Sequence, residues 1–142
     1  MLRRSIVECC GADHHNDRDL LGPWLANKTI DNVRKWIDDD GTVAIVAETD
    51  GSIVGVAMMI KSGEVTLLYV VPEVLFCGVG KALLAELEAG SRRLGLPALT
   101  LRSTKTAHEF YRRNGFRAAG DADSWHGIVS FPMVKELEAG FE

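Results

Sequence analysis

The sequence has little cysteine and no long apolar run. Only three cysteines occur among its 142 residues, Cys9, Cys10 and Cys77. Two adjacent cysteines and a distant one cannot form a disulfide framework and do not match the spacing of zinc ligands, so we interpret them as free thiols and expect no metal site. The longest apolar stretch, Ile53–Ile60, is far shorter than the ~18 residues that a membrane-spanning helix needs. We therefore expect no membrane segment.

The sequence also lacks a secretory signal, internal repeats and linker-like segments. Residues 1–6 contain neither the long apolar region nor the small-residue cleavage site of a signal peptide, so we expect a cytoplasmic protein. The composition, 46% hydrophobic and 25% charged, is ordinary for a globular protein. A chain of 142 residues without repeats or linkers is expected to form one domain over residues 1–142.

An excess of positive charge is absent as well, since the formal net charge is −4. General binding of nucleic acid needs a large basic surface, so we expect no nucleic-acid partner. The charge is nevertheless unevenly distributed. Residues 1–77 carry 7 basic and 12 acidic side chains, residues 78–117 carry 8 and 3, and residues 118–142 carry 1 and 5. A basic middle segment therefore lies between two acidic flanks.

The first half of the sequence predicts a short strand, a helix and three consecutive antiparallel strands. The strand is expected from Arg3 to Glu8, and Thr29 is a typical N-cap for the helix that follows it. Pro23, in the segment before Thr29, limits any earlier helix. The three strands are expected over residues 43–48, 53–60 and 64–71, with a tight turn at Asp50-Gly51 between the first two.

The second half predicts helix, strand, helix, strand and strand. A glycine-rich segment, Gly78-Val79-Gly80, precedes a long helical pattern that continues through Leu94. A buried strand is expected over residues 98–102, and a shorter helix, capped by Thr104 or Thr106, up to residue 113. Two final strands are expected over residues 116–119 and 128–134. This order predicts an α/β protein with a mixed α+β sheet rather than a doubly wound parallel sheet.

The glycine-rich segment does not fit two common phosphate-binding loops. A P-loop needs glycine five residues before Gly80 and serine or threonine after Lys81, but Leu75 and Ala82 occupy those positions. A dinucleotide fingerprint that starts at Gly78 needs a small third residue, where the sequence has Leu83, and the strands before it read as a meander rather than a βαβ unit. The glycine-rich segment therefore needs another interpretation, which depends on residues outside the loop.

Two motifs together carry a family resemblance. The first comprises Leu68-Tyr69-Val70-Val71-Pro72 followed by Gly78-Val79-Gly80-Lys81-Ala82-Leu83-Leu84, and the second is Ala107-x-x-Phe110-Tyr111-x-x-x-Gly115-Phe116. At this spacing, and in this order of elements, the sequence resembles the GCN5-related N-acetyltransferase (GNAT) superfamily. The resemblance extends from about Val43 to the C-terminus and is weak before Thr29. It implies the GNAT-like acyl-CoA N-acyltransferase fold, with acetyl-CoA as cosubstrate and no metal.

The resemblance implies a set of coenzyme-binding residues. The backbone of a splayed strand, here Leu68, Tyr69 and Val70, would bind the pantetheine arm of acetyl-CoA. The backbone N–H groups of the next loop would bind the pyrophosphate at a helix N-terminus, where Lys81 adds a cation; that loop comprises Phe76, Cys77, Gly78, Val79, Gly80 and Lys81. Thr104 stands where many relatives have a coenzyme-contacting Asn, although a plain capping role is also open.

Acetyl transfer to an amine needs a base, an oxyanion donor and an acid for the departing thiolate. The resemblance implies Tyr111, the tyrosine of the Phe-Tyr pair, as the acid. The resemblance also implies Glu64 as the candidate base, because histone-type members of the superfamily place their catalytic glutamate at the same spacing, eleven residues before the position of Leu75. A chain of water molecules is the alternative. The N–H of Val70 is the candidate oxyanion donor. The partners are then acetyl-CoA and a primary amine of a small molecule or peptide, and the acidic flanks favour a cationic amine. The protein is expected to be a monomer or a homodimer.

The loop departs from the family pattern at its start. The family usually has Gln or Arg where this sequence has Leu75, and Phe76 is bulky. This departure keeps an alternative open, a non-catalytic acyl-CoA-binding regulatory module of the same fold. An acyltransferase for longer acyl groups is a third hypothesis. Cys77 lies near a helix N-terminus, which can favour the thiolate, so a redox role is also open, beside a plain packing role.

Overall fold

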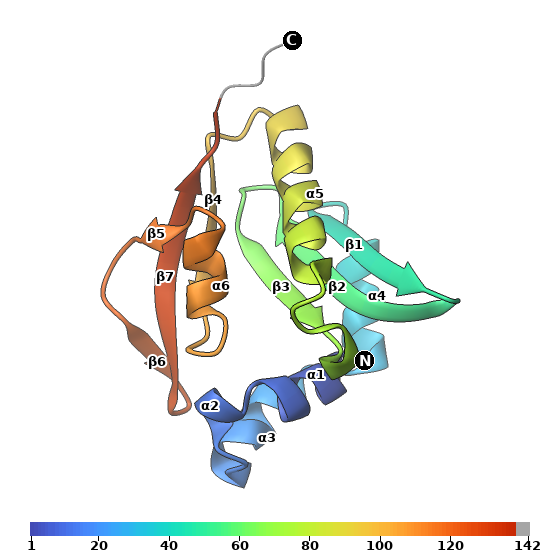
Figure 1. Cartoon of the computed structure of the whole chain (residues 1–142), viewed down its shortest axis with the longest axis vertical. Helices are drawn as coiled ribbons and strands as arrows, with labels where there is room; N and C mark the ends of the chain where they lie inside the picture. Colours follow the sequence, from blue (N-terminus) through green and yellow to red (C-terminus); the bar gives the residue numbers. More distant parts are fainter. Residues whose placement is uncertain (139–142) are drawn as a thin grey trace.

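A computed structural model describes residues 1–138 (Figure 1). The helices are α1 (Leu2–Cys9), α2 (Gly11–His14), α3 (Arg18–Ala26), α4 (Ile30–Asp38), the 3₁₀ helix η1 (Pro72–Val74), α5 (Val79–Arg93) and α6 (His108–Arg113). The strands are β1 (Thr42–Thr49), β2 (Ser52–Ile60), β3 (Val65–Val70), β4 (Ala98–Ser103), β5 (Arg117–Ala118), β6 (Asp123–Trp125) and β7 (Ile128–Glu136). No helix within residues 1–138 is long and apolar enough to cross a membrane.

The predicted helix after Thr29 and the predicted hairpin are confirmed. The Thr29 hydroxyl accepts a hydrogen bond from the N–H of Asn32 at 3.1 Å, which caps α4. Asp50 and Gly51, with φ of 50° and 80°, form the turn between β1 and β2, because both central residues of such a tight turn need positive φ. The predicted order from β3 to the last strand is also confirmed, but the short strand β6 was not expected.

The N-terminal prediction is wrong. Residues 3–8, expected as a strand, lie in α1, and α2 and α3 follow. The helix is favoured because Ile6 and Cys10, four residues apart, are both buried on one side, while Arg4 and Glu8 form an exposed ion pair. Pro23 does not prevent an earlier helix either, since it lies inside α3.

The strands form two sheets that meet at one point. The first has the antiparallel order β1-β2-β3, and the second the order β4-β7-β5, with β6 paired to β7. Within residues 1–138 the sheets are joined by a parallel bridge between Glu64 and Thr100, where the Thr100 N–H donates to the carbonyl of Gly63 at 2.9 Å. Beyond the bridge β3 and β4 separate, and the sheets lean apart in Figure 1.

A bulge in β3 accompanies this separation. Met58 pairs with Leu67 and Met59 pairs with Val65, so Thr66 is an extra residue without a partner on β2. A bulge bends its strand and increases its twist, which turns β3 away from β4 just after the bridge. The Thr66 hydroxyl satisfies the local backbone by donating to the carbonyl of Met58 at 3.3 Å.

The main core lies between α5 and both sheets. Leu83, Leu84 and Leu87 of α5 pack with residues of β2 and with Leu99 and Leu101 of β4. Buried apolar contacts of this kind are the main favourable term for folding. The helix therefore fixes the two sheets relative to each other while their far ends stay apart, and α1 and α2 lie across the open end in Figure 1.

Candidate active site

A cavity of about 340 Å³ lies between the diverging strands. Ligand pockets typically begin at ~300 Å³. Most of the predicted site residues line it, namely Leu68, Tyr69, Val70, Phe76, Gly78, Gly80, Lys81, Thr104 and Tyr111. The cavity between the strands is thus lined by residues from β3, the loop before α5, the loop before α6, and α6 itself.

The end of β3 presents free backbone groups to this cavity. The N–H of Val71 donates to the carbonyl of Val54 on β2 at 2.9 Å. Backbone groups alternate between the two edges of a strand, so those of Leu68 and Val70 point away from β2 and into the cleft. This is the edge that would pair with β4 if the strands did not separate. It therefore offers the N–H groups of Leu68 and Val70 and the carbonyl of Leu68 to an extended ligand, whereas the carbonyl of Val70 already accepts from Ser5.

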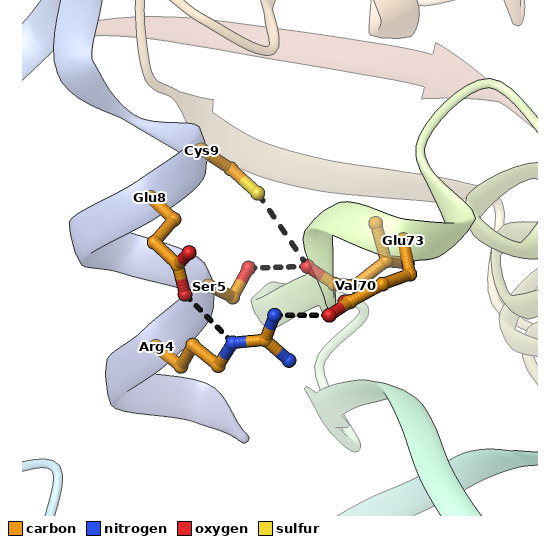
Figure 2. Close-up of polar contacts among 6 residues, drawn as sticks. All are labelled: Arg4, Ser5, Glu8, Cys9, Val70 and Glu73. Atoms are coloured by element: carbon orange, nitrogen blue, oxygen red, sulfur yellow. Dashed lines mark hydrogen bonds and ion pairs between the residues drawn. The ribbon is translucent and has the colours of Figure 1, made fainter.

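Helix α1 contacts the same edge (Figure 2). The carbonyl of Val70 accepts a hydrogen bond from the Ser5 hydroxyl at 2.6 Å, and the Cys9 Sγ lies 3.8 Å from the same oxygen. Arg4 forms an ion pair with Glu73 of η1. Ser5 and Cys9 also line the cavity. Sequence reasoning missed these residues because the segment was interpreted as a strand.

The loop between η1 and α5 is shaped for an anion. Phe76 and Gly78 adopt positive φ, 63° and 85°, and Gly78 is the N-cap of α5. The first N–H groups of a helix have no acceptor within it, so those of Val79, Gly80 and Lys81 are available at the positive end of the helix dipole. The N–H of Cys77 is already used, since it donates to the carbonyl of Val74 at 3.1 Å.

The departures of this loop from the family pattern do not fill the cavity. The Phe76 side chain is fully exposed (102%). Its φ is positive, which is unusual for a bulky residue, and a Cβ at Gly78 would meet no atom within 4 Å, so Phe76 does not crowd that position. Cys77 is also exposed, and its Sγ lies 3.5 Å from the carbonyl of Leu75. The bulky Phe76 side chain therefore does not cover the N–H groups at the start of α5.

Tyr111 is buried in α6 with its ring against other aromatic rings. Its centroid lies 5.3 Å from that of Phe110 and 5.5 Å from that of Phe116, both edge-on. Burial raises the pKa of the Tyr111 phenol well above its usual value, because the interior disfavours the phenolate. Tyr111 thus stays protonated at neutral pH and keeps a proton to donate.

Tyr69 supplies a second phenol to the cavity. The Trp24 Nε1–H donates to its hydroxyl at 3.3 Å. Burial raises the pKa of Tyr69 as it does that of Tyr111. The sequence singled out Tyr69 only for its backbone. Its side chain could have been noticed because the chain has just two tyrosines, and both fall within the family motifs.

Two predicted residues differ in their surroundings. Thr104 lines the cavity, and its hydroxyl accepts from the N–H of Ala107 at 3.1 Å, which orders the turn before α6. Glu64 is exposed at the bridge between the sheets and is not among the residues that line the cavity. The structure therefore brings the predicted acid and most of the predicted coenzyme-binding residues together, and it places the candidate base at the bridge between the sheets.

Sequence comparison identifies the family of the chain. A family model described as an acetyltransferase (GNAT) domain matches residues 24–137. This match covers most of the chain, so the chain belongs to the GNAT acetyltransferase family, as the motifs predicted.

Curated relatives match part of the chain. An amino-acid acetyltransferase of Azotobacter vinelandii (strain DJ / ATCC BAA-1303) is 36% identical over 80 residues, which are 53% of this chain and 18% of that protein. An amino-acid acetyltransferase of Ralstonia nicotianae (strain ATCC BAA-1114 / GMI1000) is 32% identical over 108 residues, 72% of this chain and 24% of that protein. The chain thus spans a quarter or less of the length of these relatives.

Solved structures confirm the fold class. A GCN5-related N-acetyltransferase from Rhodopseudomonas palustris superimposes with a TM-score of 0.83 at 24% identity, covering 96% of this chain and 85% of that chain. The PaiA N-acetyltransferase from Thermoplasma acidophilum, solved in complex with coenzyme A, has a TM-score of 0.79 at 20% identity and covers 95% and 87%. At these identities the likeness establishes the fold.

Proposed function

We propose that the protein transfers the acetyl group of acetyl-CoA directly to a primary amine of a small molecule or peptide. One observation carries this proposal: residues of the β3 edge, of the N-terminus of α5 and of α6, Tyr111 among them, line one cavity. The coenzyme-bound neighbour from Thermoplasma acidophilum has the same fold, which supports acetyl-CoA as the ligand. Its pantetheine arm would lie along Leu68 and Val70.

The phosphates of the coenzyme would lie at the start of α5. The N–H groups of Val79, Gly80 and Lys81 provide the donors, and the Lys81 ammonium adds a positive charge. Gly80 lies close to α6, since a Cβ at this position would be 3.4 Å from the Phe110 ring, an ordinary van der Waals contact. Gly78 and Cys77 would shape the loop, and Thr104 would add a hydroxyl.

The proposal gives three groups a chemical role. The N–H of Val70 would donate to the thioester oxyanion, and Tyr111 would protonate the departing thiolate of coenzyme A. Glu64 is proposed as the base that takes the proton of the acceptor ammonium, acting from the bridge between the sheets. The acetyl carbon thus moves from sulfur to nitrogen in one attack, without a covalent enzyme intermediate.

The acceptor is the least specified part of the proposal. The relatives named above are amino-acid acetyltransferases, which favours a small amine. The acidic flanks favour a cationic amine, but the cavity wall gives that idea no support. The charged residues that line the cavity within residues 1–138 are Lys81 and Arg102, and both are basic.

Turnover on an amine panel tests the proposal. Acetyl-CoA is mixed with amino acids, polyamines, aminoglycosides and lysine peptides, and release of the coenzyme thiol is measured with and without enzyme. We expect thiol release that saturates with one class of amine and yields an acetylated product of matching mass. Tight coenzyme binding without turnover on any amine would favour the regulatory module, and faster turnover with longer acyl-CoA would favour a different acyl donor.

A further inference from the structure

A buried carboxylate connects the N-terminal helices to the loop before α6. Asp13, on α2, is only 8% exposed. One of its oxygens accepts from the N–H of Lys105 at 2.7 Å, and the other accepts from the N–H of Thr106 at 3.1 Å and from the Thr106 hydroxyl. These partners are more than ninety residues away in sequence. The proposed chemistry gives Asp13 no role of its own.

The loop that Asp13 holds leads directly to the proposed acid. Ala107, the N-cap of α6, has no side-chain oxygen to cap the helix. Its N–H donates to the Thr104 hydroxyl at 3.1 Å, and its carbonyl accepts from the N–H of Tyr111 at 3.1 Å. The orientation of this short helix therefore depends on the preceding loop, which is fixed by Asp13 from another element.

The same N-terminal unit holds the other arm of the cleft. Cys10 is both the C-cap of α1 and the N-cap of α2, so the two helices follow each other without a linker. At the α1 end, Ser5, 2% exposed, donates to the carbonyl of Val70 (Figure 2). The peptide that begins with this carbonyl is held on its other side by the bond from Val71 to Val54. One helical unit thus contacts both arms.

We propose that Asp13 and Ser5 are positioning residues for acetyl transfer, Asp13 acting through Tyr111 on α6 and Ser5 acting through the end of β3. This inference rests on the proposed function. It concerns a part of the chain outside the residues 24–137 that match the family model. These hydrogen bonds hold the cleft at a fixed width, so Tyr111 and the end of β3 keep a fixed distance from each other.

A double-mutant cycle between Asp13 and Tyr111 tests the first contact. Asp13→Asn keeps the size of the side chain but offers a single acceptor oxygen and turns an amide NH₂ toward a backbone donor. We expect kcat to fall roughly 10-fold or more, since small displacements of reacting groups can cost ~100-fold, while the KM for acetyl-CoA changes less than about threefold. In a Tyr111→Phe background the same substitution is expected to cause no further loss.

Three outcomes would overturn the inference or its basis. An equal fold-loss of kcat in both backgrounds would show a merely structural role for Asp13, and unchanged kcat would show no role. Absence of turnover by the wild-type enzyme on every amine would instead refute the proposed function itself. If Asp13→Asn does not fold, as judged by circular dichroism, Thr106→Val is used in the same cycle, with Thr106→Ser expected to restore kcat.

A matched pair on α1 tests the second contact. Ser5→Ala removes the donor to Val70, and we expect the Kd for acetyl-CoA to rise several-fold. Glu8→Gln, one turn along the same helix, removes an exposed partner of Arg4 and is expected to leave the Kd within about twofold, since exposed ion pairs contribute little. An equal Kd for the Ser5→Ala variant and the wild-type enzyme would overturn the role of Ser5.

Discussion

At the residue scale, the groups with proposed chemical roles differ in how strongly neighbouring residues hold them in place. Tyr111 packs against Phe110 and Phe116, and burial raises the pKa of its phenol above the usual value. The backbone of Val70 is held from both sides. Glu64, by contrast, is exposed, and its proposed role depends on where the acceptor amine binds. Substitutions at these positions therefore test different parts of the mechanism.

Removal of the Tyr111 hydroxyl is expected to slow the chemical step. Because burial raises the pKa of Tyr111, the phenol is protonated throughout the neutral range, as the proposed acid must be. Tyr111→Phe keeps the ring and its packing but removes the proton donor, so we expect kcat to fall roughly 100-fold, with the KM for acetyl-CoA little changed. Steady-state kinetics across a range of pH measure this. Unchanged kcat at every pH would contradict the role of Tyr111.

Glu64→Gln tests the proposed base. The substitution keeps the shape of the side chain and removes its ability to accept a proton, so we expect kcat/KM to fall roughly 100-fold at neutral pH. The loss should shrink as the pH approaches the pKa of the acceptor amine, ~10.4 for a lysine-like amine, because the free base then needs no proton acceptor. A rate within twofold of the wild type at neutral pH would assign this step to water.

The three thiols are expected to react at different rates. Burial raises the pKa of Cys10 to about 12 and also raises that of the half-buried Cys9, which disfavours the reactive thiolates, whereas Cys77 is exposed. Iodoacetamide should therefore modify Cys77 first, and bound acetyl-CoA should slow this reaction by covering the loop. Peptide mapping by mass spectrometry measures it. Modification of Cys10 before Cys77 would contradict the burial of Cys10.

At the element scale, the cleft depends on contacts between parts of the chain that are distant in sequence. The bulge at Thr66 bends β3, and Gly63 lets the two sheets approach, since a Cβ there would lie 2.6 Å from the carbonyl of Ala98. Helix α5 is also tied to β7 by an ion pair between Glu88 and Lys135. The Lys135 ammonium donates in addition to the carbonyl of Asn114 at 2.8 Å.

Loss of one member of this ion pair should lower stability. Lys135→Met keeps an apolar stem but leaves the nearly buried Glu88 carboxylate without its cation. We expect the free energy of unfolding to fall by about 2 kcal/mol. This is less than the full cost of a wholly buried unpaired charge, because Lys135 is partly exposed. The double variant with Glu88→Gln should recover part of the loss. Urea denaturation measures both. A double variant less stable than Lys135→Met would contradict this account.

At the scale of the whole molecule, the sequence predicted the part of the fold with strong local signals. The Asp50-Gly51 turn, the Thr29 cap and the long helical pattern after Gly78-Val79-Gly80 each depend on nearby residues, and all three predictions are confirmed. Residues 3–8 were mistaken for a strand because a short segment gives little periodicity, and its helix is fixed by distant partners such as Val70.

The site was predictable where a backbone motif defines it and not where it depends on tertiary contacts. Most of the residues that the two motifs predicted for the site line the cavity. Asp13 could not be found from the sequence, because its partners Lys105 and Thr106 meet it only in the folded chain. The hydrogen bond that occupies the N–H of Cys77 was equally hidden, since it forms within an irregular turn.

The central claim is that the cleft between β3 and β4 binds acetyl-CoA, and isothermal titration calorimetry tests it most directly. We predict one acetyl-CoA bound per chain by the wild-type protein. We also predict at least roughly tenfold weaker binding by Gly78→Val, because a β-branched residue is strained at a φ of 85° and would reshape the loop. No binding by the wild type, or equal binding by both proteins, would contradict the account.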